Sequence, residues 1–109
     1  MSMGQNRKAE STITVYIDSG LEEIVPGFLE NRRRDVQKIE TALGQDDLNT
    51  ICVIGHRMRG DGGGYGFDAI SRIGEGMEQA AGRHDKEAIR RHLSDLVDFL
   101  ARITVVYRR

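Results

Sequence analysis

The segment from Gly55 to Phe67 reads GHRMRGDGGGYGF, and six of its thirteen residues are glycine. Such a stretch is typical either of a loop that surrounds a ligand or of a helix that lets another molecule come close. A dinucleotide-binding loop needs Gly-x-Gly-x-x-Gly after a strand, and a P-loop needs Gly-Lys-Ser/Thr. Neither motif occurs, because both candidate glycine frames end on an aromatic residue and the segment holds no lysine. We therefore interpret the segment as a helix.

A helix through this segment turns His56 toward solvent. At about 100° per residue, three aliphatic residues lie on the opposite side of the helix and are the expected core contacts: Ile51, Ile54 and Met58. Arg59 lies about 60° to one side of His56. Gly60 and Gly63 lie within about 40° of its direction. The sequence predicts an exposed imidazole with one cation and two bare positions beside it.

The glycines destabilise such a helix. Each glycine inside a helix costs roughly 1 kcal/mol relative to alanine, so Gly60, Gly62 and Gly63 together cost about 3 kcal/mol. That is a large share of the stability of a small domain. We expect a functional reason, namely that a surface without side chains lets the backbone of another protein reach His56. Gly64 to Gly66 are expected to form the next turn, with Gly66 suited to a positive φ.

Neighbouring residues extend this surface. Cys52 lies one turn before His56 and about 40° from its direction, and Val53 leans to the same side. Together with Arg57 they predict a partly apolar patch that contacts a partner. A Cys–His catalytic pair is disfavoured, because no Asn or Asp nearby could orient the imidazole. His84 and His92 are interpreted as ordinary surface or capping residues.

Helical periodicity continues on both sides of the central segment. It predicts a helix that ends near Gly44 after a short helix and a break at Pro26. Asp46 or Asp47 should cap the central helix. A third helix should end at Gly82, and Asp85 should cap a last one that reaches Tyr107. Short connections predict antiparallel neighbours. The expected fold class is all-α, an antiparallel four-helix bundle with a short N-terminal extension.

The two ends of the chain carry different patterns. Residues 1–11 are polar and are expected to be a disordered leader, so the domain spans residues 12–109. Residues 12–18, TITVYID, alternate β-branched and polar residues and predict a short extended segment. Residues 103–107, ITVVY, are also β-branched. They fit either the end of the last helix, with Ile103 and Tyr107 on its apolar face, or an extended tail.

Composition narrows the class of protein. The 109 residues suit one domain, and a net charge of −1 argues against a nucleic-acid binder. The arginine cluster NRRRD, residues 31–35, has acidic residues on both sides and is interpreted as a solvated face or a docking rim. A single cysteine indicates a reducing compartment. No stretch resembles a signal peptide or a membrane span, so we expect a cytoplasmic protein without membrane contact.

The segment HRMRGDGGGYGFDAISRIGEGME, residues 56–78, resembles the histidine-containing phosphotransfer (HPt) domain. The signature of that family is His-x-x-Lys-Gly-x-x-small-x-x-Gly, followed by an apolar helix that ends in Leu-Glu. The residues that match these positions in order are His56, Arg59, Gly60, Gly63, Gly66 and the pair Met77–Glu78. The resemblance extends from about Asp18 to Tyr107. Arg59 departs from the lysine of the signature but keeps its positive charge.

The resemblance implies a phosphocarrier of a multistep phosphorelay rather than an enzyme. His56 would accept a phosphoryl group from an aspartate of a receiver domain and pass it on, with Arg59 stabilising the phosphate. The partner surface would include Cys52, Val53, Arg57, Gly60 and Gly63. No cofactor of its own is implied, since Mg²⁺ would come with the receiver. The expected partners are receiver domains and a histidine kinase system, and the expected state is a monomer.

Two alternatives stay open from the sequence. The chain could be a binding module that docks receiver-type partners through the glycine-rich face and Arg32–Arg34 without transferring phosphate. The replacement of lysine by Arg59 is its only support. A small metal or redox protein that uses His56 and Cys52 is less well supported, because further ligands are missing.

Overall fold

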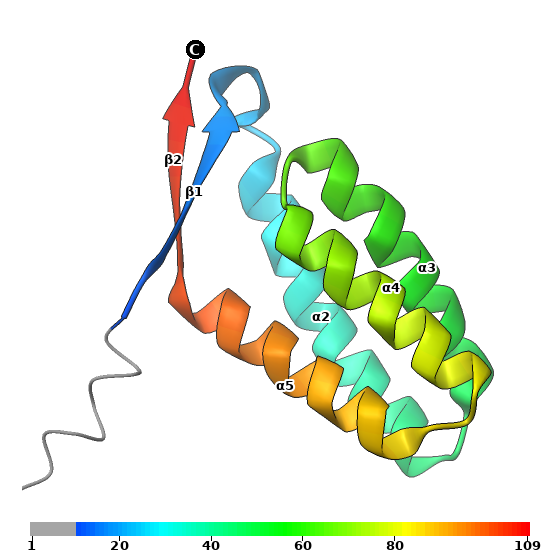
Figure 1. Ribbon diagram of the computed structural model, residues 1–109. Helices are drawn as coiled ribbons and strands as arrows, with labels where there is room; N and C mark the ends of the chain where they lie inside the picture. Colours follow the sequence, from blue (N-terminus) through cyan, green and yellow to red (C-terminus); the bar gives the residue numbers. More distant parts are fainter. Residues whose placement is uncertain (1–10) are drawn as a thin grey trace, which may run out of the picture.

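The computed structural model describes residues 11–109, which form four helices and a small two-stranded sheet (Figure 1). In chain order the elements are strand β1 (Ile13–Asp18), a 3-10 helix (Ser19–Leu21), helices α2 (Val25–Gly44), α3 (Leu48–Tyr65), α4 (Asp68–Gly82) and α5 (Lys86–Arg102), and strand β2 (Ile103–Arg108). The helices pack side by side, and the sheet stands beside them (Figure 1). The predicted helical bundle is confirmed, with the sheet as a minor addition. The expected leader, residues 1–11, lies outside the described residues except for Ser11.

The helix boundaries follow local signals in the sequence. Pro26 lies in the first turn of α2, where its missing N–H leaves no intrahelical bond unmade. The carboxylate of Asp47 accepts from the backbone N–H of Thr50 at the start of α3. Asp85 caps α5 in the same way. The predicted caps and the predicted break at Pro26 are therefore confirmed.

The core between the helices is mainly aliphatic. Ile51, Ile54 and Met58 of α3 are buried, as the helical periodicity predicts. The largest completely buried side chains are Phe67, Ile39, Ile51, Met58, Ile70, Met77, Ile89, Leu96 and Val25. They come from α2, α3, α4 and α5 and from the residue just before α4, so one core joins all four helices. This core fixes the rotation of α3 and hence the side from which His56 projects.

Helices α3 and α4 approach each other closely because three glycines lie in their contact, each against the backbone of the other helix. A Cβ on Gly55 would lie 2.7 Å from the backbone nitrogen of Glu78, and one on Gly74 would lie 2.6 Å from that of Arg59. A Cβ on Gly62 would lie 2.6 Å from the nitrogen of Ser71. The prediction that Gly62 clears a surface for a partner is therefore wrong, because Gly62 is buried against α4.

The end of α3 confirms one glycine prediction and corrects another. Gly66 follows the helix with φ of 87°, in the left-handed region that favours glycine. Gly64 was expected in the turn but belongs to the last turn of α3. The glycine run therefore continues the helix almost to its end, and only Gly66 turns the chain toward α4.

The last helix ends at Arg102, before the β-branched segment, and does not reach Tyr107. Ile103–Arg108 forms β2 and pairs in parallel with β1, from Ile13 opposite Ile103 to Asp18 opposite Arg108. The extended alternative is thus the one observed. β-Branched residues fit a pleated surface better than a helix, and β1 supplies the partner strand.

Within residues 11–109, no helix is both long enough and apolar enough to cross a membrane.

Candidate functional site

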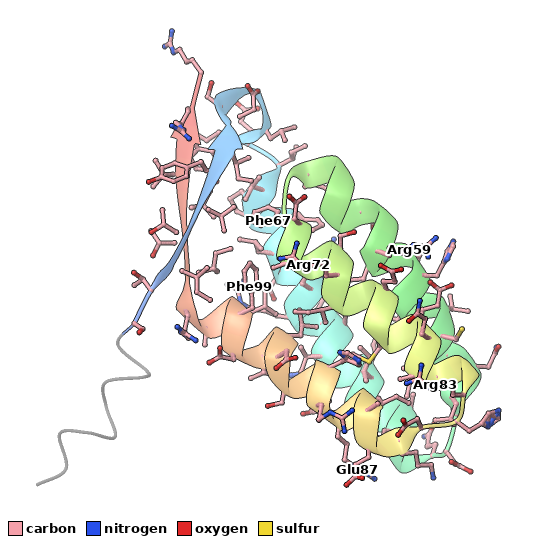
Figure 2. All side chains as sticks on the ribbon, in the orientation of Figure 1. Arg59, Phe67, Arg72, Arg83, Glu87 and Phe99 are labelled. Carbon is pink, nitrogen blue, oxygen red and sulfur yellow. The ribbon has the colours of Figure 1, made fainter. Side chains whose placement is uncertain are left out.

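His56 projects from the outer surface of α3, and 63% of its side chain is exposed. Its backbone position is fixed by its neighbours Gly55 and Met58, which are buried in the interface with α4 and in the core. The imidazole is therefore held on a rigid helix while its ring stays open to solvent. Arg59 projects from the outer side of α3 (Figure 2), and it contacts Glu78 of α4 as His56 does.

The carboxylate of Glu78 contacts the imidazole from α4. Its Oε2 atom lies 3.0 Å from Nδ1 of His56. A carboxylate can only accept, so the ring N–H at Nδ1 donates to it. In the neutral ring this leaves the lone pair on Nε2 free. The geometry thus leaves Nε2 as the unprotonated nitrogen of the neutral His56 ring.

The same carboxylate contacts Arg59. Its Oε1 atom lies 3.4 Å from Nη1 of Arg59, and only 25% of the Glu78 side chain is exposed. The Oε1 atom is buried and accepts no well-aligned hydrogen bond within the described part of the chain. Glu78 therefore links His56 and Arg59, and the arginine is held by charge attraction more than by a directed bond.

The backbone at Arg59 is held in place by α4. The hydroxyl of Ser71 donates to the Arg59 carbonyl at 2.6 Å. Gly74 lies against the Arg59 nitrogen on the same side. Arg59 thus starts from a fixed backbone position while its guanidinium remains partly exposed.

Bare backbone borders His56, as the helical geometry predicts. A Cβ on Gly60 would meet no atom within 4 Å, and one on Gly63 would meet only the Ser71 hydroxyl at 3.9 Å. Val53 and Arg57 are exposed on the same helix. Cys52 is half-buried, with its sulfur 3.8 Å from the carbonyl of Glu78, so it lies at the edge of this surface.

Glu78 was not expected as a partner of His56. In the sequence, Glu78 stands out only as half of the Met77–Glu78 pair of the signature, and no Asn or Asp near His56 could orient the imidazole. The sequence feature that could have identified Glu78 is its position directly after Met77, which is fully buried and fixes the rotation of α4. What the sequence lacks is the relative position of α3 and α4, which brings residues 56 and 78 together.

The arginine cluster is only partly a solvated face. Arg32 is buried, with its Nε 2.9 Å from Oδ2 of Asp35 and its guanidinium over the ring of Phe28. The expectation of a solvated docking rim is wrong for Arg32, because its charge is directed into the α2–α3 contact, 3.7 Å from Asp61. Arg33 and Arg34 are exposed.

Asp35 is buried beside Arg32. Burial raises the pKa of the Asp35 carboxyl, and the nearby Arg32 guanidinium opposes this change. The pair therefore serves the packing of α2 against α3, and Arg32 is not available to a partner.

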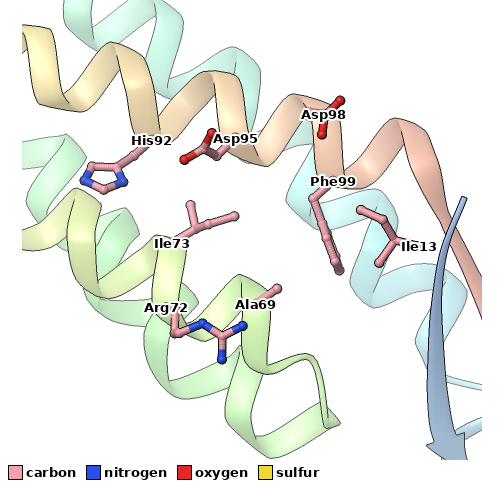
Figure 3. Close-up of a pocket in the computed structure, with 8 residues that line it drawn as sticks. All are labelled: Ile13, Ala69, Arg72, Ile73, His92, Asp95, Asp98 and Phe99. Carbon is pink, nitrogen blue, oxygen red and sulfur yellow. The ribbon is translucent and has the colours of Figure 1, made fainter. Parts of the chain in front are cut away.

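The other histidines lie away from this surface. His84 is in the connection between α4 and α5, near the first residues of α3. His92 packs its ring on Gly76, where a Cβ would lie 2.5 Å from the ring. It lines a groove of about 400 Å³ between α4, α5 and β1 (Figure 3). None of the residues that line the groove belongs to α3. In the described chain, no three His, Cys, Asp or Glu side chains gather as a metal site.

Comparison with known proteins identifies the family. A family model described as the Hpt domain matches residues 23–104, which include all four helices. Searches of curated proteins and of solved structures found no match. Since the family model covers most of the chain, this chain belongs to the Hpt domain family, whose members carry phosphoryl groups on histidine in phosphorelays.

Proposed function

We propose that His56 is the residue of this domain that carries the phosphoryl group. It would accept the group from the aspartyl phosphate of a receiver domain and pass it on. The observation that carries the proposal is the exposed imidazole whose Nδ1 donates to Glu78, which leaves Nε2 free beside bare backbone. Arg59 is the proposed phosphate-stabilising residue.

The transfer step uses groups that lie within reach. The lone pair of Nε2 forms a bond to phosphorus while the bond between phosphorus and the aspartyl oxygen breaks, and the carboxylate of the receiver leaves. The ring becomes positively charged, because Nδ1 keeps its proton. The Glu78 carboxylate stabilises that charge at 3.0 Å. Negative charge spread over the equatorial oxygens attracts the guanidinium of Arg59.

The docking surface that we propose for the receiver is the exposed side of α3. Gly60 and Gly63 offer open backbone, Val53 offers apolar contact, and Arg57 offers a positive charge. Cys52 contributes only at the edge. In this scheme the Mg²⁺ that assists transfer belongs to the receiver, and the histidine kinase system supplies the phosphoryl group upstream.

A phosphotransfer assay tests the proposal. The protein is incubated with a phosphorylated receiver domain, and phosphate that is acid-labile and alkali-stable is followed on this chain. We expect His56→Gln to abolish labelling, while the matched controls His84→Gln and His92→Gln keep it. Labelling that persists in His56→Gln would overturn the assignment of the carrier residue.

One observation favours a second function. The Arg59 guanidinium lies 3.4 Å from Glu78 rather than free beside the imidazole. A domain in this arrangement could dock a receiver without accepting phosphate. Tight receiver binding with no labelled histidine, measured in the same assay, would support this binding-module function.

A further inference from the structure

The small sheet leaves hydrogen-bonding groups unused. Within residues 11–109 it contains only β1 and β2, so each strand has one edge with no neighbouring strand. Parallel sheets are normally large and covered on both faces, and an isolated pair of strands is marginally stable in water. A parallel pair of this kind therefore has room for a further strand.

Apolar side chains cross the outer face of the sheet. Tyr16 is 55% exposed and Val106 is 38% exposed, and the two are partners in the strand register. They form one row across both strands, on the side away from the helices. The guanidinium of Arg108 lies 4.1 Å from the centre of the Tyr16 ring and covers part of it. The row ends at the free edge of β2.

The edges lack the features that usually protect exposed strands. Such edges commonly carry charged residues, proline or a bulge that prevents pairing with another chain. Residues 13–17 and 103–107 contain no charged residue, proline or glycine. Charges occur only at the last positions, Asp18 and Arg108. Nothing in the strands opposes the addition of a further strand.

We propose that β2 pairs with β2 of a second copy of this chain. The two strands run antiparallel about a two-fold axis at Val106 and form a four-stranded sheet. In this register Val106 faces Val106 of the second copy, and Tyr16 of each copy extends the apolar row on either side. Thr104 faces Arg108 of the second copy, so no like charges are opposed.

Charge and burial favour this arrangement over an adjacent register of β2 and over pairing through β1. A register centred on Val105 would place Arg102 opposite Arg108 of the second copy twice, and directly opposed like charges are destabilising. Pairing through β1 is disfavoured because Ile17 is only 3% exposed and packs against Gly66, which places β1 against the bundle. β2 has no fully buried residue.

The expected dimer is weak and leaves His56 accessible. Two six-residue strands bury less surface than the interfaces of stable complexes, so the dimer should form only at high concentration. This departs from the monomer that the family resemblance implies. The sheet lies on the opposite side of the bundle from Arg59 (Figure 2), so a receiver could still reach α3 in each copy.

Sedimentation velocity from low micromolar to about 1 mM, the range of weak association, tests the proposal. We expect the dimer fraction of the wild type to rise with concentration. Val106→Lys should abolish the dimer, because two ammonium groups would face each other at the axis. Val97→Lys, at an exposed valine of α5, is the matched control and should keep it. A wild type that stays monomeric, or equal effects of both substitutions, would overturn the proposal.

Disulfide trapping tests the register. In a Cys52→Ser background, Val106→Cys should form a disulfide-linked dimer on mild oxidation, because opposed residues lie close enough for the bond. Tyr16→Cys is the control from the same row, since the two copies would be three strand spacings apart, about 14 Å. Preferential linking through Tyr16→Cys would mean pairing through β1 and would contradict the proposal. Unchanged helical circular dichroism confirms that each variant is folded.

Discussion

At the scale of single residues, the site depends on one carboxylate shared between two groups. Glu78 lies 3.0 Å from the His56 imidazole and 3.4 Å from the Arg59 guanidinium. It fixes which ring nitrogen is free, and it also attracts the cation that we propose for phosphate binding. An incoming phosphoryl group would compete with Glu78 for the guanidinium of Arg59. It would also make the imidazole positively charged, and the Glu78 carboxylate would stabilise that charge.

Glu78→Gln tests the charge of Glu78 while it keeps a hydrogen-bond acceptor at the imidazole. Glu78→Gln keeps an acceptor for Nδ1–H but cannot neutralise the positive ring of the phosphohistidine. A charge-assisted hydrogen bond exceeds a neutral one by about 1.4 kcal/mol, so we expect transfer to slow about tenfold. The measurement is the rate of transfer from a phosphorylated receiver. Glu75→Gln, on the exposed surface of the same helix, is the matched control. A Glu78→Gln rate equal to wild type would show that the carboxylate charge has no part in transfer.

Arg59→Ala should affect transfer more than stability. Its ion pair with Glu78 is partly exposed, and such pairs contribute less than about 1 kcal/mol to folding. Transfer should slow at least tenfold, because the developing negative charge on phosphorus loses its nearest cation. Transfer rates and melting temperatures of the same samples check this. A large drop in melting temperature with normal transfer would make Arg59 a structural residue.

At the scale of elements, α3 carries glycines on two of its sides for two different reasons. Gly55 and Gly62 meet the backbone of α4, where any Cβ would clash. Gly60 and Gly63 face open space beside His56. The first pair sets the distance between α3 and α4, and through it the contact of Glu78 with the imidazole. The second pair leaves room for a partner.

Matched substitutions should distinguish the two kinds of glycine. Gly62→Ala should lower the unfolding free energy by roughly 1–3 kcal/mol, because α4 must move away. Gly63→Ala should raise it by up to about 1 kcal/mol through helix propensity. Gly63→Leu should keep the helical content but slow transfer, because its side chain obstructs the receiver. Thermal unfolding and transfer rates measure these effects, and unchanged transfer in Gly63→Leu would contradict the role of open backbone.

At the scale of the whole molecule, local signals predicted most of the fold. The caps Asp47 and Asp85 and the left-handed Gly66 are properties of a few adjacent residues, so the sequence sufficed. The end of α5 was ambiguous, because Ile103 and Tyr107 are four residues apart and also fit a helix. Only pairing with β1, from the opposite end of the chain, favours the strand.

The candidate site also combines features that one helix determines with features that depend on contacts between helices. The exposure of His56 and the open positions at Gly60 and Gly63 follow from the angular spacing of one helix. The Glu78 contact and the burial of Gly62 depend on how α4 lies against α3, which no single helix pattern contains. Arg32 was misplaced for the same reason, because its burial depends on Phe28, Asp35 and the neighbouring α3. The sequence patterns therefore predicted the features of single helices but not the contacts between helices.

The two connections at one end of the bundle should make its stability sensitive to acid. Lys86 pairs with Asp46 there and joins the α2–α3 and α4–α5 connections. Hydrogen bonds from Lys86 and Thr50 lower the pKa values of Asp46 and Asp47 from 3.8, and the backbone N–H of Ala88 lowers the pKa of Asp85. These carboxylates stabilise the fold above their unfolded pKa, and that stability is lost as the pH falls through the lowered values.

Asp35 acts in the opposite direction. Burial of its charged carboxylate destabilises the fold and raises its pKa, so protonation removes this cost at a pH above the unfolded pKa of aspartate.

We therefore expect the unfolding free energy to fall steeply only below a pH of about 4, the pKa range of unfolded aspartate. Asp85→Asn tests the origin of this loss, because asparagine keeps the cap but does not titrate. The variant should melt close to wild type at neutral pH and lose less stability on acidification. Asp95→Asn, at an exposed aspartate in the middle of α5, is the matched control and should follow the wild-type curve. Parallel curves for Asp85→Asn and wild type, measured by thermal unfolding across the acidic range, would exclude the α5 cap as a source of the acid sensitivity.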